Sequence, residues 1–182
     1  MSSLNNKNGA SSSEIIWLGR GGQGAFTAAK LLGAAYTIDD DNKYALAFPS
    51  FGPERRGAPV RAFTKLDTKP VVDRSQTEKA DFIVIIDDTL YSPQLQGLLK
   101  PTGKIIVNSK NNIDGALTFD ADSIAAEFRL PTANTIMLGL LVGLSNVVTS
   151  DEAVEAIKGY MPKKIQERNI NALLRAVQEV AE

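Results

Sequence analysis

The sequence predicts a single α/β domain in which a mostly parallel sheet is flanked by helices on both faces and followed by C-terminal helices. Short β-branched apolar runs alternate with stretches of helical periodicity, and the end of the chain is helical throughout. The clearest run, residues 81–87, is apolar at every position between its two terminal aspartates, which is typical of a strand covered on both faces. The length of 182 residues fits one domain with a substantial core.

Residues 1–13 are predicted to form a flexible tail ahead of a domain over residues 14–182. Ser, Asn and Gly dominate this segment, and it contains no apolar stretch of the kind that a signal peptide needs. The longest apolar stretch, residues 136–148, is interrupted by glycines and is shorter than the roughly 20 residues that span a membrane. We therefore expect a cytoplasmic protein without a membrane segment.

The first elements are a buried strand and a helix joined by a glycine-rich turn. Residues 14–18 form a short apolar run that ends in glycine, as a strand does before a tight turn. Residues 25–38 carry apolar side chains at helical spacing. A strand at 44–48 follows, and the proline-rich segment 49–59 after it is a loop.

The remaining elements follow from alternation, apolar runs and capping signals. Residues 60–66 alternate apolar and polar side chains, which indicates a half-exposed strand. The last helix has its apolar residues along one stripe and is therefore amphipathic. The other expected elements are strands at 81–87, 104–108 and 117–119, and helices at 92–99, 122–128, 134–148, 151–160 with Ser150 as N-cap, and 163–181.

The chain contains no cysteine and no histidine. Without cysteine it cannot ligate an ordinary iron–sulfur cluster, and without histidine it lacks the usual neutral-pH base and the commonest metal ligand. These absences favour a binding role, and we expect no catalytic residue and no metal site in this chain. The net charge of −1 and the lack of a long basic block argue against nucleic acid as a partner.

A glycine loop follows the first expected strand and opens the first helix. It fits the pattern G-x-G-x-x-G at Gly19, Gly21 and Gly24. Glycines let the backbone approach a ligand closely, and the helix N-terminus then offers N–H groups to an anion. The loop predicts a phosphate-bearing ligand. The alternative is that the glycines only allow the strand and helix to pack closely.

The glycine pattern also occurs in dinucleotide-binding domains, where an acidic residue at the end of the second strand holds the ribose. The acidic residues here, Asp39 to Asp41, come before the second strand. That strand ends in Phe48, Pro49 and Ser50 instead. The misplaced acid argues against a nicotinamide or flavin dinucleotide as the ligand.

The loop over residues 47–60 combines two aromatic residues, three prolines and the pair Arg55 and Arg56. An arginine in a stiff loop suits phosphate or carboxylate, because its guanidinium group binds two oxygens at once. Arg20 in the glycine loop is placed to join them. The alternative is that the arginines form surface ion pairs, which are worth only about 0–1 kcal/mol each.

Both loops carry a resemblance to a known family. The motifs Gly19-Arg-Gly-Gly-Gln-Gly24 and Phe48-Pro-Ser-Phe-Gly-Pro-Glu-Arg-Arg-Gly-Ala-Pro-Val60 resemble the gamma subunit of pyruvate:ferredoxin oxidoreductase and its 2-oxoacid relatives. Val72-Asp-Arg-Ser-Gln76, the run from Asp81 to Leu90, and Asn134 with Met137-Leu-Gly139 continue the likeness in the same order along the chain.

The resemblance implies a non-autonomous subunit of a complex. The alpha and beta subunits of that family bind thiamine diphosphate with Mg, and a delta subunit carries iron–sulfur clusters. The assembled enzyme decarboxylates a 2-oxoacid, passes electrons to ferredoxin and forms an acyl-CoA, while the gamma subunit contributes to coenzyme A binding. The residues expected to bind CoA are Gly19, Arg20, Gly21, Gly22, Gln23, Gly24, Thr27, Ser50, Arg55, Arg56 and Asn134.

Two other functions stay open at this point: a stand-alone nucleotide- or CoA-binding module, and an NAD-dependent dehydrogenase of the Rossmann type.

Two smaller motifs carry weaker signals. Asp87-Asp88 after a strand resembles a metal-binding end, but no further cluster of ligands accompanies it. Ser75, between Arg74 and Gln76, is interpreted as part of an interface, because no histidine exists to activate it.

Overall fold

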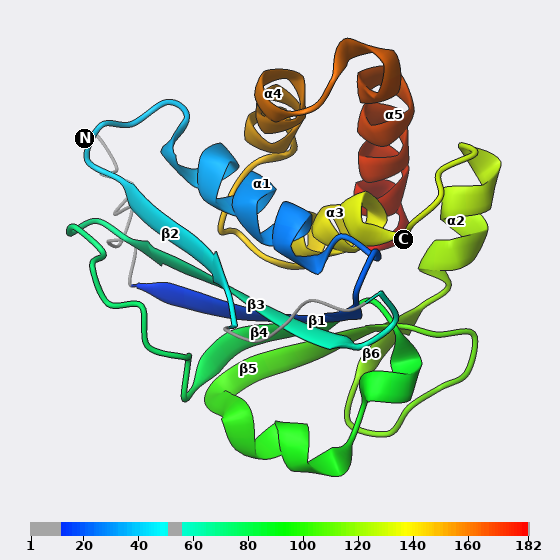
Figure 1. Cartoon of the computed structure of the whole chain (residues 1–182), viewed down its shortest axis with the longest axis horizontal. Helices are drawn as coiled ribbons and strands as arrows, with labels where there is room; N and C mark the ends of the chain where they lie inside the picture. The colour runs from blue at the N-terminus through cyan, green and yellow to red at the C-terminus, as the bar shows by residue number, and fades with distance from the viewer. Residues whose placement is uncertain (1–11, 51–55, 182) are drawn as a thin grey trace, which may run out of the picture.

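The structure, a computed structural model, describes residues 12–50 and 56–181. The predicted tail therefore lies almost wholly outside the described residues, and so does Arg55. Strands and helices alternate along the first part of the chain, and helices alone make up its end, as the sequence predicted (Figure 1). The elements are β1 (Ser13–Arg20), α1 (Ala25–Thr37), β2 (Tyr44–Pro49), β3 (Pro59–Asp67), β4 (Ala80–Ile85), the 3-10 helices η1 (Asp88–Leu90) and η2 (Pro93–Leu98), β5 (Leu99–Asn108), β6 (Leu117–Phe119), α2 (Ala121–Glu127), α3 (Asn134–Leu144), α4 (Ser150–Tyr160) and α5 (Lys163–Glu179).

The six strands form one sheet in the order β2-β3-β1-β4-β5-β6. β1, β4, β5 and β6 run parallel to one another, while β3 is antiparallel to both of its neighbours, β1 and β2. β2 is therefore parallel to β1, and five strands end at the same edge of the sheet. The chain moves from β1 toward β2 on one side and later toward β4 on the other. The loops after β1 and β4 consequently diverge at a topological switch point, where open α/β sheets bind ligands.

All the α-helices of the described chain that pack on the sheet cover one of its faces (Figure 1). The other face has a core of its own, built from residues such as Ile83 and Ile105, and within the part of the chain that the structure describes it is covered by η1, η2 and loop residues. The fold class is confirmed, but the expectation of helices on both faces is met on the second face by 3-10 helices alone. Residues 83–86 of the run 81–87 are nevertheless buried, because both coverings exclude water from this part of the chain.

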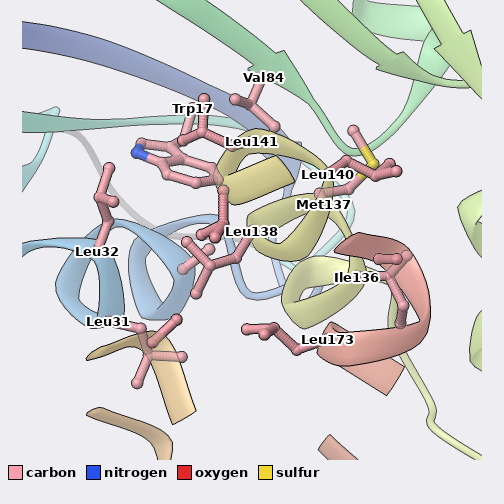
Figure 2. Packing of buried hydrophobic residues seen from close by; sticks show 14 of the residues in the cluster. Trp17, Leu31, Leu32, Val84, Ile136, Met137, Leu138, Leu140, Leu141 and Leu173 are labelled. Atoms are coloured by element: carbon pink, nitrogen blue, oxygen red, sulfur yellow. The ribbon is translucent and has the colours of Figure 1, made fainter. Parts of the chain in front are cut away.

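The larger core lies between the sheet and the helices. Figure 2 shows side chains from β1, α1, α3 and α5 meeting there, among them Trp17 and Leu141. The indole N–H of Trp17 donates to the Thr64 hydroxyl at 3.0 Å, and that hydroxyl donates to the Ala29 carbonyl at 2.9 Å. This chain of hydrogen bonds joins β1, β3 and α1, so it fixes where the start of α1 lies over the sheet.

α3 is the central helix of this layer and packs closely on α5. Gly139 allows the approach, since a Cβ at that position would lie 2.5 Å from the Leu173 carbonyl oxygen. No helix in the described ranges is both long and apolar enough to cross a bilayer.

Several element bounds differ from those expected. Residues 93–98 are a 3-10 helix, and the strand expected at 104–108 begins already at Leu99. β3 is buried over residues 62–66, because it lies inside the sheet with material on both faces. Thr149 is the N-cap of α4 in place of Ser150, in a capping box with Glu152.

Candidate functional site

The glycine loop joins β1 to α1 at the edge where the parallel strands end. Gly22 and Gly24 have φ angles of +93° and +81°, a left-handed conformation that side chains other than glycine rarely adopt. Gly24 is the N-cap of α1, and no side chain caps this helix end. The first intrahelical bond runs from the Ala28 N–H to the Gly24 carbonyl at 3.0 Å. The N–H groups before it therefore have no partner within the helix and can receive an anion.

The arginine-bearing segment returns beside the glycine loop. The Gly21 N–H donates to the Ala58 carbonyl at 2.8 Å, and the Gly57 N–H donates to the Gly21 carbonyl at 3.1 Å. Arg56 thereby forms a parallel bridge with Gly21, and its side chain is exposed. Among the described residues, no ion pair involves Arg56. The expectation that the two loops lie side by side is confirmed for residues 56–58.

A cavity of about 320 Å³ opens where these segments meet, and we call it the glycine-loop cavity. Its wall consists of residues 20–22 and 24 of the glycine loop, the first turn of α1 as far as Thr27, and Val60 of β3, whereas Gln23 and Arg56 are not part of it. The Thr27 side chain is half-buried at this wall. The cavity combines unpaired backbone N–H groups with one hydroxyl, which is the chemistry of a phosphate or carboxylate site.

Arg20 and Gln23 are both bonded to Asp87, the second residue after the end of β4. Gln23 donates from Nε2 to Asp87 Oδ2 at 2.9 Å, and Arg20 Nε lies 3.4 Å from the same oxygen. The other two guanidinium nitrogens of Arg20 donate to the Gly57 carbonyl at 3.1 Å and to the Thr89 hydroxyl at 2.8 Å. Arg20 therefore joins three segments of the chain, and its charge is already paired.

The carboxyl group of Asp87 is held in its ionised form by this network. Partial burial acts to raise its pKa, but hydrogen bonds from Thr89 and Gln23, with Arg20 alongside, outweigh burial and lower the pKa from its ordinary value. Asp87 is thus a charged acceptor at neutral pH.

A larger crevice of about 450 Å³ borders Gln23 and Asp87, at the switch point between β1 and β4. Its carboxylates accept hydrogen bonds from neighbouring residues: Asp88 from Ser109 at 2.7 Å, and Asp122 from Asn108 at 2.9 Å. A fourth carboxylate, Asp120, caps α2. Over the described ranges, no group of three or more acidic residues is arranged to hold a metal ion.

Asn134, at the start of α3, contacts the glycine loop from the side of the helix layer. Its Nδ2 donates to the Gly24 carbonyl at 3.3 Å, and its Oδ1 accepts from the Thr132 hydroxyl at 2.8 Å. Ser50 lies two strands away from β1, where its N–H donates to the Arg61 carbonyl at 2.8 Å. Neither Asn134 nor Ser50 is part of the wall of the glycine-loop cavity.

The acidic residues that a dinucleotide site would need lie at the wrong edge of the sheet. Asp39 to Asp41 fall between the end of α1 and the start of β2. Because β2 is parallel to β1, its beginning lies at the edge opposite the glycine loop. This placement agrees with the sequence argument against a dinucleotide.

The sequence interpretation missed Asp87 and Thr89 as partners of the glycine loop. The available signal was the Asp-Asp-Thr run directly after the clearest strand, because parallel neighbours of β1 end beside its loop. That run was interpreted only as a weak metal-binding signal.

Comparison with known proteins agrees with the fold and with the family resemblance. A family model for pyruvate ferredoxin/flavodoxin oxidoreductase matches residues 14–179. A pyruvate synthase subunit PorC from Methanothermobacter thermautotrophicus is 41% identical over 173 residues, covering 92% of this chain and 95% of that protein. The common subunit gamma of pyruvate/ketoisovalerate oxidoreductases from Pyrococcus furiosus is 36% identical, covering 91% and 96%. The crystal structure of pyruvate oxidoreductase subunit PORC from Thermotoga maritima is 33% identical, covers 92% and 96%, and superposes with a TM-score of 0.78.

Proposed function

Because this chain belongs to the pyruvate ferredoxin/flavodoxin oxidoreductase family as a gamma subunit, we propose that it binds coenzyme A within a 2-oxoacid oxidoreductase complex. The glycine-loop cavity holds a phosphate of CoA. The thiamine diphosphate with its Mg, and the iron–sulfur clusters, are carried by alpha, beta and delta subunits. The assembled enzyme oxidatively decarboxylates a 2-oxoacid such as pyruvate to an acyl-CoA and passes the electrons to ferredoxin.

The observation that carries this proposal is the glycine-loop cavity itself. The unpaired N–H groups at the start of α1 face a space of about 320 Å³, and no acidic residue occurs in the first turn of that helix. The positive end of the helix dipole is therefore available to a ligand. Arg56, exposed beside Gly21, supplies a cation whose charge no described residue neutralises.

The division of labour follows from the composition. A chain without cysteine or histidine has neither the thiolates for an iron–sulfur cluster nor an imidazole base. Its contribution to the reaction is to bind and orient CoA, while partner subunits supply the groups that react.

The test is the CoA dependence of the assembled complex that contains variants of this subunit. Arg56→Ala removes the free cation, and Thr27→Val removes the hydroxyl at nearly constant volume. Loss of one charge-assisted hydrogen bond is expected to raise the KM for CoA roughly tenfold and to leave the KM for the 2-oxoacid unchanged.

Arg74→Ala is the matched control, because it removes the same charge from an exposed arginine in the segment between β3 and β4. β3 ends at the edge opposite the glycine loop, so this change leaves the cavity intact. The proposal is wrong if Arg56→Ala and Thr27→Val both leave the CoA dependence the same as Arg74→Ala does.

A free-standing CoA-binding module is distinguished from a subunit by purification from the native source. A subunit copurifies with chains that carry thiamine diphosphate and clusters. A free-standing module elutes alone, and the purified chain then binds CoA with the same affinity as it does in the cell extract.

A further inference from the structure

The loop after β4 carries a residue that no part of the proposed CoA site uses directly. We infer that Asp87 is a positioning residue, which sets the shape of the glycine-loop cavity by holding Arg20 and Gln23. This inference rests on the proposed function, because its effect is measured as CoA affinity.

Only one orientation of the Gln23 side-chain amide satisfies its hydrogen-bond partners. Its Oε1 accepts from the backbone N–H of Arg20 at 2.7 Å, and its Nε2 donates to Asp87 Oδ2 at 2.9 Å. An ionised carboxylate can only accept hydrogen bonds, so Asp87 requires the NH₂ end of the amide to face it. The carbonyl end is thereby directed at the backbone of the glycine loop.

Asp87 is itself fixed by Thr89. The Thr89 N–H donates to Asp87 Oδ1 at 3.1 Å, and the Thr89 hydroxyl donates to the same oxygen at 2.5 Å. That hydroxyl in turn accepts from Arg20 at 2.8 Å. Each oxygen of Asp87 therefore has its own set of donors, one from the loop after β1 and one from the loop after β4.

The consequence for the cavity follows through Arg20. Its guanidinium group lies against Asp87 and donates to the Gly57 carbonyl at 3.1 Å, beside the point where Gly57 and Gly21 pair. Asp87 thus determines where Arg20 sits, and Arg20 determines how the segment after residue 55 lies along the glycine loop. Each of the three guanidinium nitrogens of Arg20 has a partner in the protein, so Arg20 acts as a brace between the loops.

Asp87→Asn breaks this arrangement without changing its volume. In one orientation of the new amide, its NH₂ group faces the NH₂ of Gln23; in the other, it faces the two donors of Thr89. If the Gln23 amide turns over instead, its NH₂ group faces the backbone N–H of Arg20, which is also a donor. No combination of orientations satisfies every donor, so the glycine loop loses its fixed position.

The matching rescue is the double variant Asp87→Asn with Gln23→Glu. A glutamate at position 23 accepts from the Arg20 N–H and also accepts from the NH₂ of the new asparagine. The asparagine oxygen still accepts from Thr89. The net charge equals that of the starting protein, and the negative charge stays close to Arg20. The hydrogen bond between positions 23 and 87 is restored with its direction reversed, whereas the contact of Arg20 Nε with position 87 is not, because an amide NH₂ and a guanidinium N–H are both donors.

The experiment measures steady-state kinetics of the assembled complex with variable CoA and saturating 2-oxoacid, together with the Tm of the complex. We expect Asp87→Asn to raise the KM for CoA roughly tenfold, with kcat changed much less, and the double variant to recover the part of that loss that comes from the bond to position 23. Gln23→Glu alone places two carboxylates together and is expected to raise the KM as well.

The outcomes separate the two proposals. If Arg56→Ala and Thr27→Val raise the KM for CoA but Asp87→Asn does not, the positioning role is refuted and the CoA site stands. If Asp87→Asn weakens CoA binding and the double variant is no better, Asp87 acts by direct contact or by charge, and the inference is overturned. If none of these variants alters the KM for CoA, the CoA site itself is wrong.

Discussion

The contact between Gly24 and Asn134 allows a quantitative test of how the glycine loop is built. Gly24→Ala puts a side chain on a residue with a φ angle of +81°. The left-handed conformation costs an alanine about 1–2 kcal/mol. The new Cβ would lie 2.8 Å from Asn134 Cγ and closer still to Nδ2, so the Asn134 side chain has to move away.

Moving Asn134 also breaks its hydrogen bond to the Gly24 carbonyl, which is worth about 0.5–1.5 kcal/mol. Together the two effects lower the free energy of unfolding by about 1.5–3.5 kcal/mol. Urea unfolding of the full-length chain measures this as a lower midpoint with an unchanged m-value.

Gly22→Ala is the control, because Gly22 has a similar φ of +93° but no atom within 4 Å of the place that a Cβ would take. It is expected to cost only the backbone strain of about 1–2 kcal/mol. In a background of Asn134→Ala, the cost of Gly24→Ala should shrink, since most of the obstructing side chain is gone. Equal costs for Gly24→Ala and Gly22→Ala would refute the view that Asn134 closes over the loop.

Two further predictions concern other parts of the chain. Hydrogen bonds from Ser75 and then Lys65 lower the pKa of Asp73 from its ordinary value of 3.8 to about 2. The ionised carboxylate therefore stabilises the fold above about pH 4, and that stability is lost as the pH falls toward 2. Asp73→Asn should flatten the dependence of the urea midpoint on pH between 4 and 2, and an unchanged dependence would contradict this role of Asp73. Gly139→Ala puts a Cβ 2.5 Å from a backbone oxygen of α5 and should destabilise the folded protein by about 1–3 kcal/mol. Gly159→Ala, in α4 with open space around it, should stabilise the folded protein by up to about 1 kcal/mol. Thermal unfolding of both variants decides whether close helix packing or helix propensity controls these positions.

The strands and the glycine loop could be predicted from the sequence because their signals are local. The apolar run at 81–87 and the glycines after residue 18 identify a buried strand and a tight turn without reference to the rest of the chain. The coverage of the second face could not be predicted in this way. Residues 93–98 have the composition of a short helix, and only their packing on the sheet decides that they form a 3-10 helix.

The partners of the glycine loop depend on strand order, which composition does not encode. Gln23 and Asp87 are 64 positions apart, and they meet because β4 lies next to β1. Asn134 is 110 positions from Gly24 and contacts the loop from the helix layer, and its role in binding CoA stays a prediction. Sequence alone identified residues near the site, while the roles of Arg20 and Gln23 as braces follow only from the geometry.

The bracing has an energetic consequence for the proposed binding of CoA. Fixing the backbone of one residue costs about 1–2 kcal/mol in conformational entropy, so a glycine-rich loop that became ordered only on binding would give up much of its affinity. In this chain the order is established during folding, by hydrogen bonds to Ala58, Asp87 and Asn134. The N–H groups at the start of α1 are therefore in place before a ligand arrives. A loop that is ordered in this way gives up less conformational entropy when a ligand binds.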